Sequence, residues 1–128
     1  MRIFKNQKGA SAVEFAIGAP FFLATIYGLA QLAILALAHA GLNHAVSEAA
    51  RVASVFPRPS DAQIKAALTD SKFGLQASQL SAPVLSETRA GGVTYLNISV
   101  TYSAPVNLLF FGTRTFNLER SKQVAVHS

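Results

Sequence analysis

The sequence has no cysteine and no tryptophan, and only 13% of its 128 residues are charged, where a soluble domain has about 25%. The absence of cysteine excludes disulfides, thiolate metal sites and a cysteine nucleophile. A chain of this length has room for one small domain at most. The shortage of charge is therefore the feature that most needs a physical explanation.

One continuous stretch without charged residues accounts for the shortage of charge. Between Glu14 and Glu48 there is no Asp, Glu, Lys or Arg, and the 24 residues from Phe15 to Ala38 are almost entirely apolar. As a helix this run is about 36 Å long, which exceeds the roughly 30 Å hydrocarbon core of a bilayer. The sequence therefore predicts a transmembrane helix over residues 10–40.

Positive charge gathers at the N-terminus. The net charge is +5, but Arg2, Lys5 and Lys8 are three of the eleven basic residues, so the rest of the chain has eight basic against six acidic residues. No basic patch with interleaved aromatics remains, and nucleic-acid binding is not expected. By the positive-inside rule these leader charges hold residues 1–9 in the cytoplasm and place the later residues across the membrane.

A conventional secretory signal is the alternative to a retained helix. Its apolar region would be about 7 to 15 residues long, followed by small residues at a cleavage site. Ala36, Ala38 and Ala40 match such a site, and cleavage there would release a secreted binding domain beginning near Gly41. The apolar run is longer than that and continues into helix-forming sequence, which favours a retained helix.

Residues 41–56 have the pattern of an amphipathic helical extension. Small residues recur in it every four positions and permit close approach, either to a neighbouring helix or, as the default, to the chain's own sheet. They are Gly41, Ala45, Ala49 and Ala53. His44, Glu48 and Arg51 are within reach of one another, and we expect an ion-pair face there and not a metal site. Pro57 and Pro59 predict that the helix ends at residue 56.

Residues 57–128 predict a small head. Ser60 and Gln63 resemble a capping box that opens a helix running to about Asp70. Apolar residues alternate with polar ones over residues 93–102, which predicts a strand, with a Gly91-Gly92 turn from an earlier strand at about 83–87 and a third strand within 115–126. The apolar run at 106–111 is interpreted as core, or alternatively as an exposed partner-binding patch. The expected fold class is α+β, a long N-terminal helix packed on a small antiparallel sheet.

The junction between the leader and the helix carries a family resemblance. A basic leader ends in Lys8-Gly9, and an acidic residue, Glu14, stands at the fifth position after it. This resembles the processing site of type IV prepilins. The string from Gly9 to Ala16, with Pro20 and Gly28 beyond it, is similar to the TadE-like pseudopilins of tight-adherence (Tad/Flp) pilus and secretion systems.

The resemblance implies a type IV pilin-like fold and cleavage by a prepilin peptidase between Gly9 and Ala10. It also implies that Glu14 pairs with the first residue of the preceding subunit and sets the assembly register. Two departures stand out: many relatives have an acidic residue where this chain has Gln31, and classical type IV pilins begin with Phe where this chain has Ala10. The major Tad pilins are much shorter and lack a head, so a minor subunit is implied.

Physical chemistry supports these assignments from the residues themselves. Glycine lets an enzyme's backbone approach the scissile bond closely, which suits Gly9. A carboxylate in the apolar phase costs about 2.5–3.5 kcal/mol on insertion scales, so Glu14 needs a partner, and the new ammonium at Ala10 is one turn away. A simpler alternative is that Glu14 complements the positive end of the helix dipole.

These observations predict a minor pilin or pseudopilin in the bacterial inner membrane, with its head in the periplasm or, within a pilus, at the cell surface. The expected partners are the prepilin peptidase, other pilin subunits, the Tad inner-membrane platform and lipid. The alternative is an uncleaved single-pass anchor whose head binds partners of an export complex. Hydrolase signatures, phosphate loops and zinc spacings are absent from the sequence, so no enzymatic activity, cofactor or metal is expected.

Overall fold

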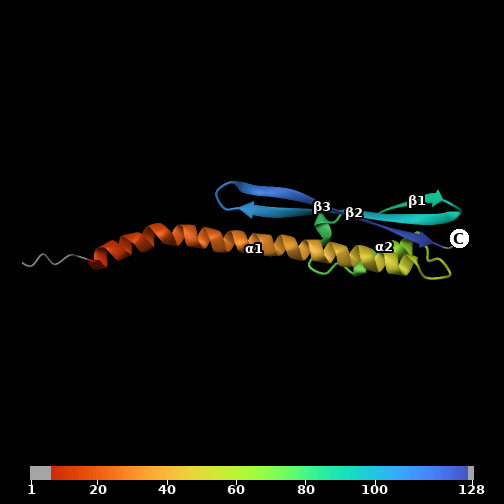
Figure 1. Cartoon of the computed structure of the whole chain (residues 1–128), viewed down its shortest axis with the longest axis horizontal. Coiled ribbons are helices and arrows are strands. Elements are labelled where there is room, and N and C mark those ends of the chain that lie inside the picture. Colours follow the sequence, from red (N-terminus) through yellow and green to blue (C-terminus); the bar gives the residue numbers. More distant parts are fainter. Residues whose placement is uncertain (1–6, 127–128) are drawn as a thin grey trace, which may run out of the picture.

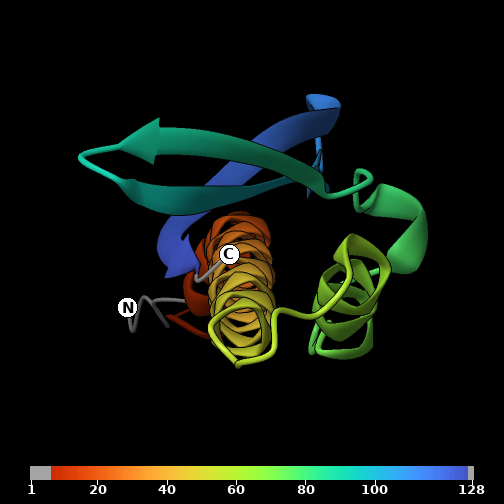
Figure 2. The same ribbon diagram turned by 90° about the vertical axis from the view of Figure 1, so that its right-hand side faces the viewer.

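A computed structural model describes residues 7–126 of the chain and shows a long helix with a small sheet laid along it (Figure 1). The elements are α1 (Gln7–Ala53), α2 (Asp61–Asp70), a 3₁₀ turn η1 (Ala77–Gln79), β1 (Val84–Ala90), β2 (Val93–Leu108) and β3 (Gly112–Val126). Viewed down the axis of α1, the two helices lie side by side and the sheet lies over α1 (Figure 2). The predicted α+β layout is confirmed.

The first helix ends three residues earlier than the prolines predict. Phe56 precedes Pro57, and a residue before proline avoids the helical region, so residue 56 is not helical. The Ser54 hydroxyl donates to the Ala50 carbonyl at 2.8 Å and satisfies one of the carbonyls that the helix end leaves free. The turn that follows brings the chain back beside α1.

The second helix begins with the predicted capping box. The amide of Gln63 donates to the Ser60 hydroxyl at 3.4 Å, and the Ser60 amide donates to the Gln63 side chain at 2.9 Å. This reciprocal pair satisfies two amides at the start of the helix. Ile64 and Leu68, one turn apart on the same face, are fully buried against the rest of the core.

The sheet has the order β1-β2-β3, with both neighbouring pairs antiparallel. Gly91 and Gly92 form the β1–β2 turn with φ values of 58° and 79°, a left-handed pair that glycine adopts without steric cost. β2 runs six residues beyond the predicted Tyr102, through Pro105. Because β1 pairs with β2 only over 93–99, β2 is an edge strand on that side around Pro105, where a missing amide is tolerated.

The core lies between the sheet and the second half of α1. Alternate residues of β2 are buried from Leu96 to Val106, as the alternation predicts for a strand with one face on the core. They pack with the buried faces of both helices, and the largest fully buried side chains are Leu42, Ile64, Leu68, Leu96 and Ile98. Two polar contacts connect the sheet to the helical part of the fold. Arg120 of β3 contacts His39 of α1, and Arg58, between the two helices, donates a hydrogen bond to Glu87 of β1 at 2.5 Å.

The head is not confined to the level of residues 41–56. The long β2–β3 hairpin extends back beside the apolar half of α1, so that its tip lies next to helix residues 24–32 (Figure 1). The overlap could not be predicted from local patterns, because it depends on the combined length of two paired strands.

Candidate functional site

The residues of the expected processing site lie at the free end of α1. Gly9 and Ala10 are helical and exposed. Arg2 and Lys5 are outside the described residues, as is the side chain of Lys8. Since Gly9 and Ala10 are exposed, the expected scissile bond is accessible.

Glu14 lies one turn after Ala10 on the same face of α1. Residues four apart on a helix have neighbouring side chains, about 5–6 Å between their β-carbons. Glu14 is exposed, and none of the ion pairs found within residues 7–126 includes it. A carboxylate is thus held at the start of an apolar helix, close to where an amino terminus at Ala10 would lie.

The first half of α1 presents apolar side chains on every side. Phe15, Phe21 and Phe22 are 76%, 73% and 67% exposed. The larger aliphatic residues from Leu23 to Leu37 are about half exposed or more, except for Leu35, which packs against the core. Within the described part of the chain, one helix is long and apolar enough to cross a membrane, and little of its most apolar stretch is buried. A helix that is apolar all round and largely exposed is compatible with a membrane anchor.

The same half of α1 has a shallow hollow. Gly18 and Ala19 leave a groove of about 470 Å³ between the larger Phe15, Phe22 and Leu23. Pro20 lies inside the helix next to this groove. Proline removes one helical hydrogen bond, and small residues allow helices to approach closely in lipid, so this region can bend and accept a neighbouring helix.

We call residues 41–53 of α1 the upper helix, and its small residues Gly41, Ala45, Ala49 and Ala53 the small-residue seam. This seam is buried within the chain's own fold. Ala45 and Ala49 have no exposed surface, and Ala53 is 2% exposed. Gly41 lies against the main chain that follows α2, at Phe73. The seam is therefore covered in the isolated subunit, and it lies about 40 Å along the helix from Glu14.

The opposite face of the upper helix carries an ion pair. Arg51 donates from Nε and Nη2 to the carboxylate of Glu48, at 2.5–3.1 Å. This hydrogen bonding, with the charge of Arg51 and a smaller contribution from His44, holds the pKa of Glu48 below its ordinary value. It also raises the pKa of Arg51. Among residues 7–126 no three His, Cys, Asp or Glu side chains gather in a way that would hold a metal ion.

The apolar run at 106–111 is the feature that sequence reasoning misplaced. Val106 is buried, but Leu109, Phe110 and Phe111 are 51%, 82% and 83% exposed. The interpretation of the whole run as core was wrong, and the exposure agrees with the alternative, in which part of the run is an exposed patch. Gly112, with φ of 77°, closes the β2–β3 turn, and a turn at this point lifts the three residues out of the strand alternation. We call residues 109–111 the hairpin tip.

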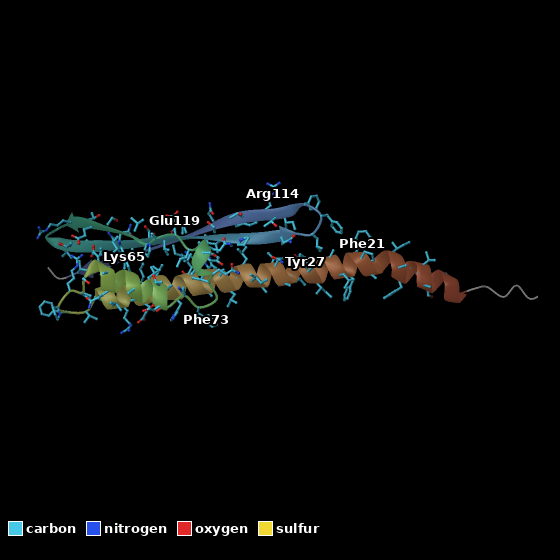
Figure 3. The ribbon with its side chains drawn as sticks, turned by 180° about the vertical axis from the view of Figure 1, so that it is seen from behind. Phe21, Tyr27, Lys65, Phe73, Arg114 and Glu119 are labelled. Carbon is cyan, nitrogen blue, oxygen red and sulfur yellow. The ribbon has the colours of Figure 1, made fainter. Side chains whose placement is uncertain are left out.

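The hairpin tip stands over α1 with an apolar groove on either side. One groove, of about 510 Å³, lies between residues 106–111 and helix residues from Ala24 to Leu32. The other, of about 530 Å³, lies between Leu109, Phe110 and helix residues from Pro20 to Ala30. Figure 3 shows Tyr27 on α1 at the level of the hairpin, Phe21 further toward the N-terminus, and Arg114 on β3 behind the tip.

One comparison with known proteins identifies part of the chain. Residues 9–51 match the family model described as TadE-like protein. The match begins at the expected scissile glycine, includes Glu14 and the whole apolar run, and ends at Arg51, before the second helix and the sheet. Neither a curated protein nor a solved structure matches the chain. The resemblance predicted from the sequence is confirmed over the matched residues.

Proposed function

We propose that this chain, whose residues 9–51 match the TadE-like family, is a minor pilin or pseudopilin of a Tad-type pilus, trimmed by a prepilin peptidase between Gly9 and Ala10. Its work is structural and not catalytic: α1 packs beside the helices of other subunits, and the head contacts its neighbours. The proposed partners are the peptidase, other pilin subunits and the inner-membrane platform of the Tad system.

The observation that carries this proposal is the position of Glu14. Its carboxylate stands at the start of an uncovered apolar helix with no ion-pair partner in residues 7–126. Cleavage before Ala10 creates an ammonium one turn away, on the same helix or on that of a neighbouring subunit. In an apolar phase such a pair has a strong attraction that is partly offset by desolvation, so it favours one axial register over others.

The order of events follows from the charges. The basic leader keeps the N-terminus cytoplasmic while α1 enters the membrane, so that the head lies outside. Removal of residues 1–9 then takes away three positive charges that would stay at the cytoplasmic surface. The shortened helix has one ammonium and one carboxylate near its end, and it can move along the membrane normal into an assembly.

Core packing argues against release of the head as a secreted domain. Ala38 is 2% exposed and belongs to the core, and Leu35 packs against it. Cleavage after Ala40 would remove both residues from the head. It would also remove the helical turn that precedes Gly41 and Leu42. The retained helix is therefore the better reading of residues 10–40.

Mass spectrometry of the N-terminus tests the proposal. The full chain is recovered from sheared filaments and from membranes of cells that carry the complete Tad system. We expect a product that begins at Ala10, and we expect Gly9→Leu to abolish it. Gly18→Leu is the matched control: it lies in the same helix with nothing within 4 Å of an added β-carbon, and should leave cleavage unchanged.

The alternative function is an uncleaved anchor, and the same experiment separates the two. An intact N-terminus at Met1 in a chain that supports normal pilus assembly would overturn the processed subunit in favour of the anchor. A soluble product beginning near Gly41 would overturn both.

A further inference from the structure

The hairpin tip is an apolar surface that the fold leaves uncovered. Phe110 and Phe111 are the most exposed large hydrophobic side chains of residues 9–126, at 82% and 83%. The paired strands behind the tip are hydrogen-bonded to each other up to Leu108 and Gly112, so the tip is presented on a well-formed hairpin. Single apolar residues at a surface are common, but three adjacent ones at a turn are a feature that needs a partner.

The depth of the tip relative to α1 identifies that partner. If the hydrocarbon core begins after Glu14, about 20 helical residues cross it, and its outer boundary lies near Ile34. The two grooves beside the tip are centred on Gly28 and on Thr25 of α1. The tip therefore lies some six to nine residues inside the boundary, a depth of about 9–14 Å at 1.5 Å per residue.

Interfacial elements bury their apolar face about 5–10 Å into the headgroup and acyl boundary, and the shallower value for the tip falls in this range. Even the deeper value leaves the tip within one leaflet, because half of a roughly 30 Å hydrocarbon core is about 15 Å. The charged residue of the hairpin that lies nearest to the tip is consistent with entry to this depth. Arg114 is exposed and stands two residues after Gly112, about 7 Å back along β3, on the side of the tip that faces away from the proposed acyl region.

We propose that the hairpin tip inserts into the outer leaflet of the bilayer that α1 spans, with Leu109, Phe110 and Phe111 among the acyl chains and Arg114 at the headgroups. The head is then held to the membrane at two places, by the helix and by the hairpin. The two grooves beside Tyr27 take lipid acyl chains. The inference rests on the membrane span of the proposed function, but not on cleavage at Gly9.

The backbone limits how far the hairpin can enter. Unpaired amides and carbonyls are not tolerated in hydrocarbon, and the outer edges of β2 and β3 are unpaired near the tip. Only the turn and its three apolar side chains can therefore enter the leaflet. Polar Asn107 and Thr113, which pair across the hairpin next to the tip, mark the depth at which entry stops.

Fluorescence quenching tests the insertion, because a chain without tryptophan allows one reporter at a time. The full chain with Phe111→Trp is reconstituted into phosphatidylcholine and phosphatidylglycerol vesicles whose acyl chains carry bromine. We expect emission shifted to the blue, loss of fluorescence to the brominated lipid, and protection from acrylamide in water. Phe73→Trp, at a 71% exposed position between α2 and η1, should show the reverse behaviour.

A third reporter separates failure of this inference from failure of the membrane span. Phe21→Trp lies in the middle of the apolar run and should be quenched by the brominated lipid if α1 spans the bilayer. Quenching of Phe21→Trp without quenching of Phe111→Trp would overturn the insertion of the tip and leave the span intact. A different outcome is that Phe111→Trp is protected from acrylamide only at high protein density and is not quenched by the brominated lipid. That result would mean that a second copy of the chain covers the tip, and it would also overturn the insertion.

Discussion

Gly41 in α1 lies directly against the main chain of Phe73: a β-carbon at position 41 would stand 2.0 Å from the Phe73 carbonyl oxygen. No side chain except hydrogen fits this gap. The contact fixes how closely the segment after α2 approaches α1, and Leu75 and Leu37 pack around it. One glycine in the middle of a 47-residue helix is therefore required by the packing of the head.

We expect Gly41→Ala to destabilise the head. The new methyl group must displace the Phe73 carbonyl or α1 itself, and such overpacking typically costs about 1–3 kcal/mol. Thermal unfolding followed by circular dichroism in detergent, or resistance of the head to protease, measures the effect. Gly28→Ala is the control, because nothing lies within 4 Å of its added β-carbon. Equal stability of the two variants would show that the contact at Gly41 is easily relieved.

The capping box of α2 predicts a smaller effect. Ser60→Ala removes the acceptor for the Gln63 amide, and loss of such a cap costs about 1 kcal/mol. Because Ile64 and Leu68 of this helix belong to the core, the loss should lower the stability of the whole head. Ser86→Ala, at an exposed position of β1, serves as the control in the same unfolding measurement, and the cap is unimportant if the two midpoints coincide.

Glu14→Gln should separate assembly from membrane insertion. The amide keeps the size of the side chain but cannot form an ion pair with an ammonium at Ala10. We expect membrane recovery and N-terminal processing to remain, and the yield of sheared filaments or of crosslinked subunits to fall. Glu48→Gln removes a carboxylate from the upper helix, well away from the amino end, and should not reduce filament yield. Normal assembly of Glu14→Gln would favour a role limited to the helix dipole.

The ion pair of Glu48 and Arg51 predicts a weak dependence of stability on pH. The pKa of Glu48 is lower in the folded chain than its ordinary value of 4.5, chiefly because Arg51 donates hydrogen bonds to it. The pair therefore adds stability above pH 4.5, and this contribution disappears as the pH falls through the lowered value. Because both groups are exposed, the effect is small and is screened by salt.

The measurement compares unfolding of the natural chain with that of Glu48→Gln as a function of pH. At neutral pH and low salt the natural chain should be slightly more stable. Well below pH 4.5 the two curves should converge, and added salt should narrow the gap at neutral pH. A gap that stays constant across this range would mean that packing of the side chain, and not its charge, is responsible.

The sequence by itself determined the features that depend on residues close to one another along the chain. The uncharged run after Glu14 requires a long apolar helix, Ser60 and Gln63 determine where α2 begins, and alternation from Leu96 to Tyr102 determines which face of β2 is buried. The resemblance around Gly9 and Glu14 also lies within one short stretch, which is why the family could be recognised from it.

Only the tertiary structure decided how far the elements overlap. The close contact of Gly41 with Phe73 involves residues 32 positions apart. The four-residue spacing of Gly41 with the later alanines marks it as a packing position, but does not show that the main chain at Phe73 is its neighbour. The exposure of Phe110 and Phe111 depends on where Gly112 turns the chain and on how long β2 and β3 stay paired. Hydrophobicity alone leaves these phenylalanines either in a core or in an exposed patch. The length of the hairpin carries them past the core, to a place beside the apolar half of α1.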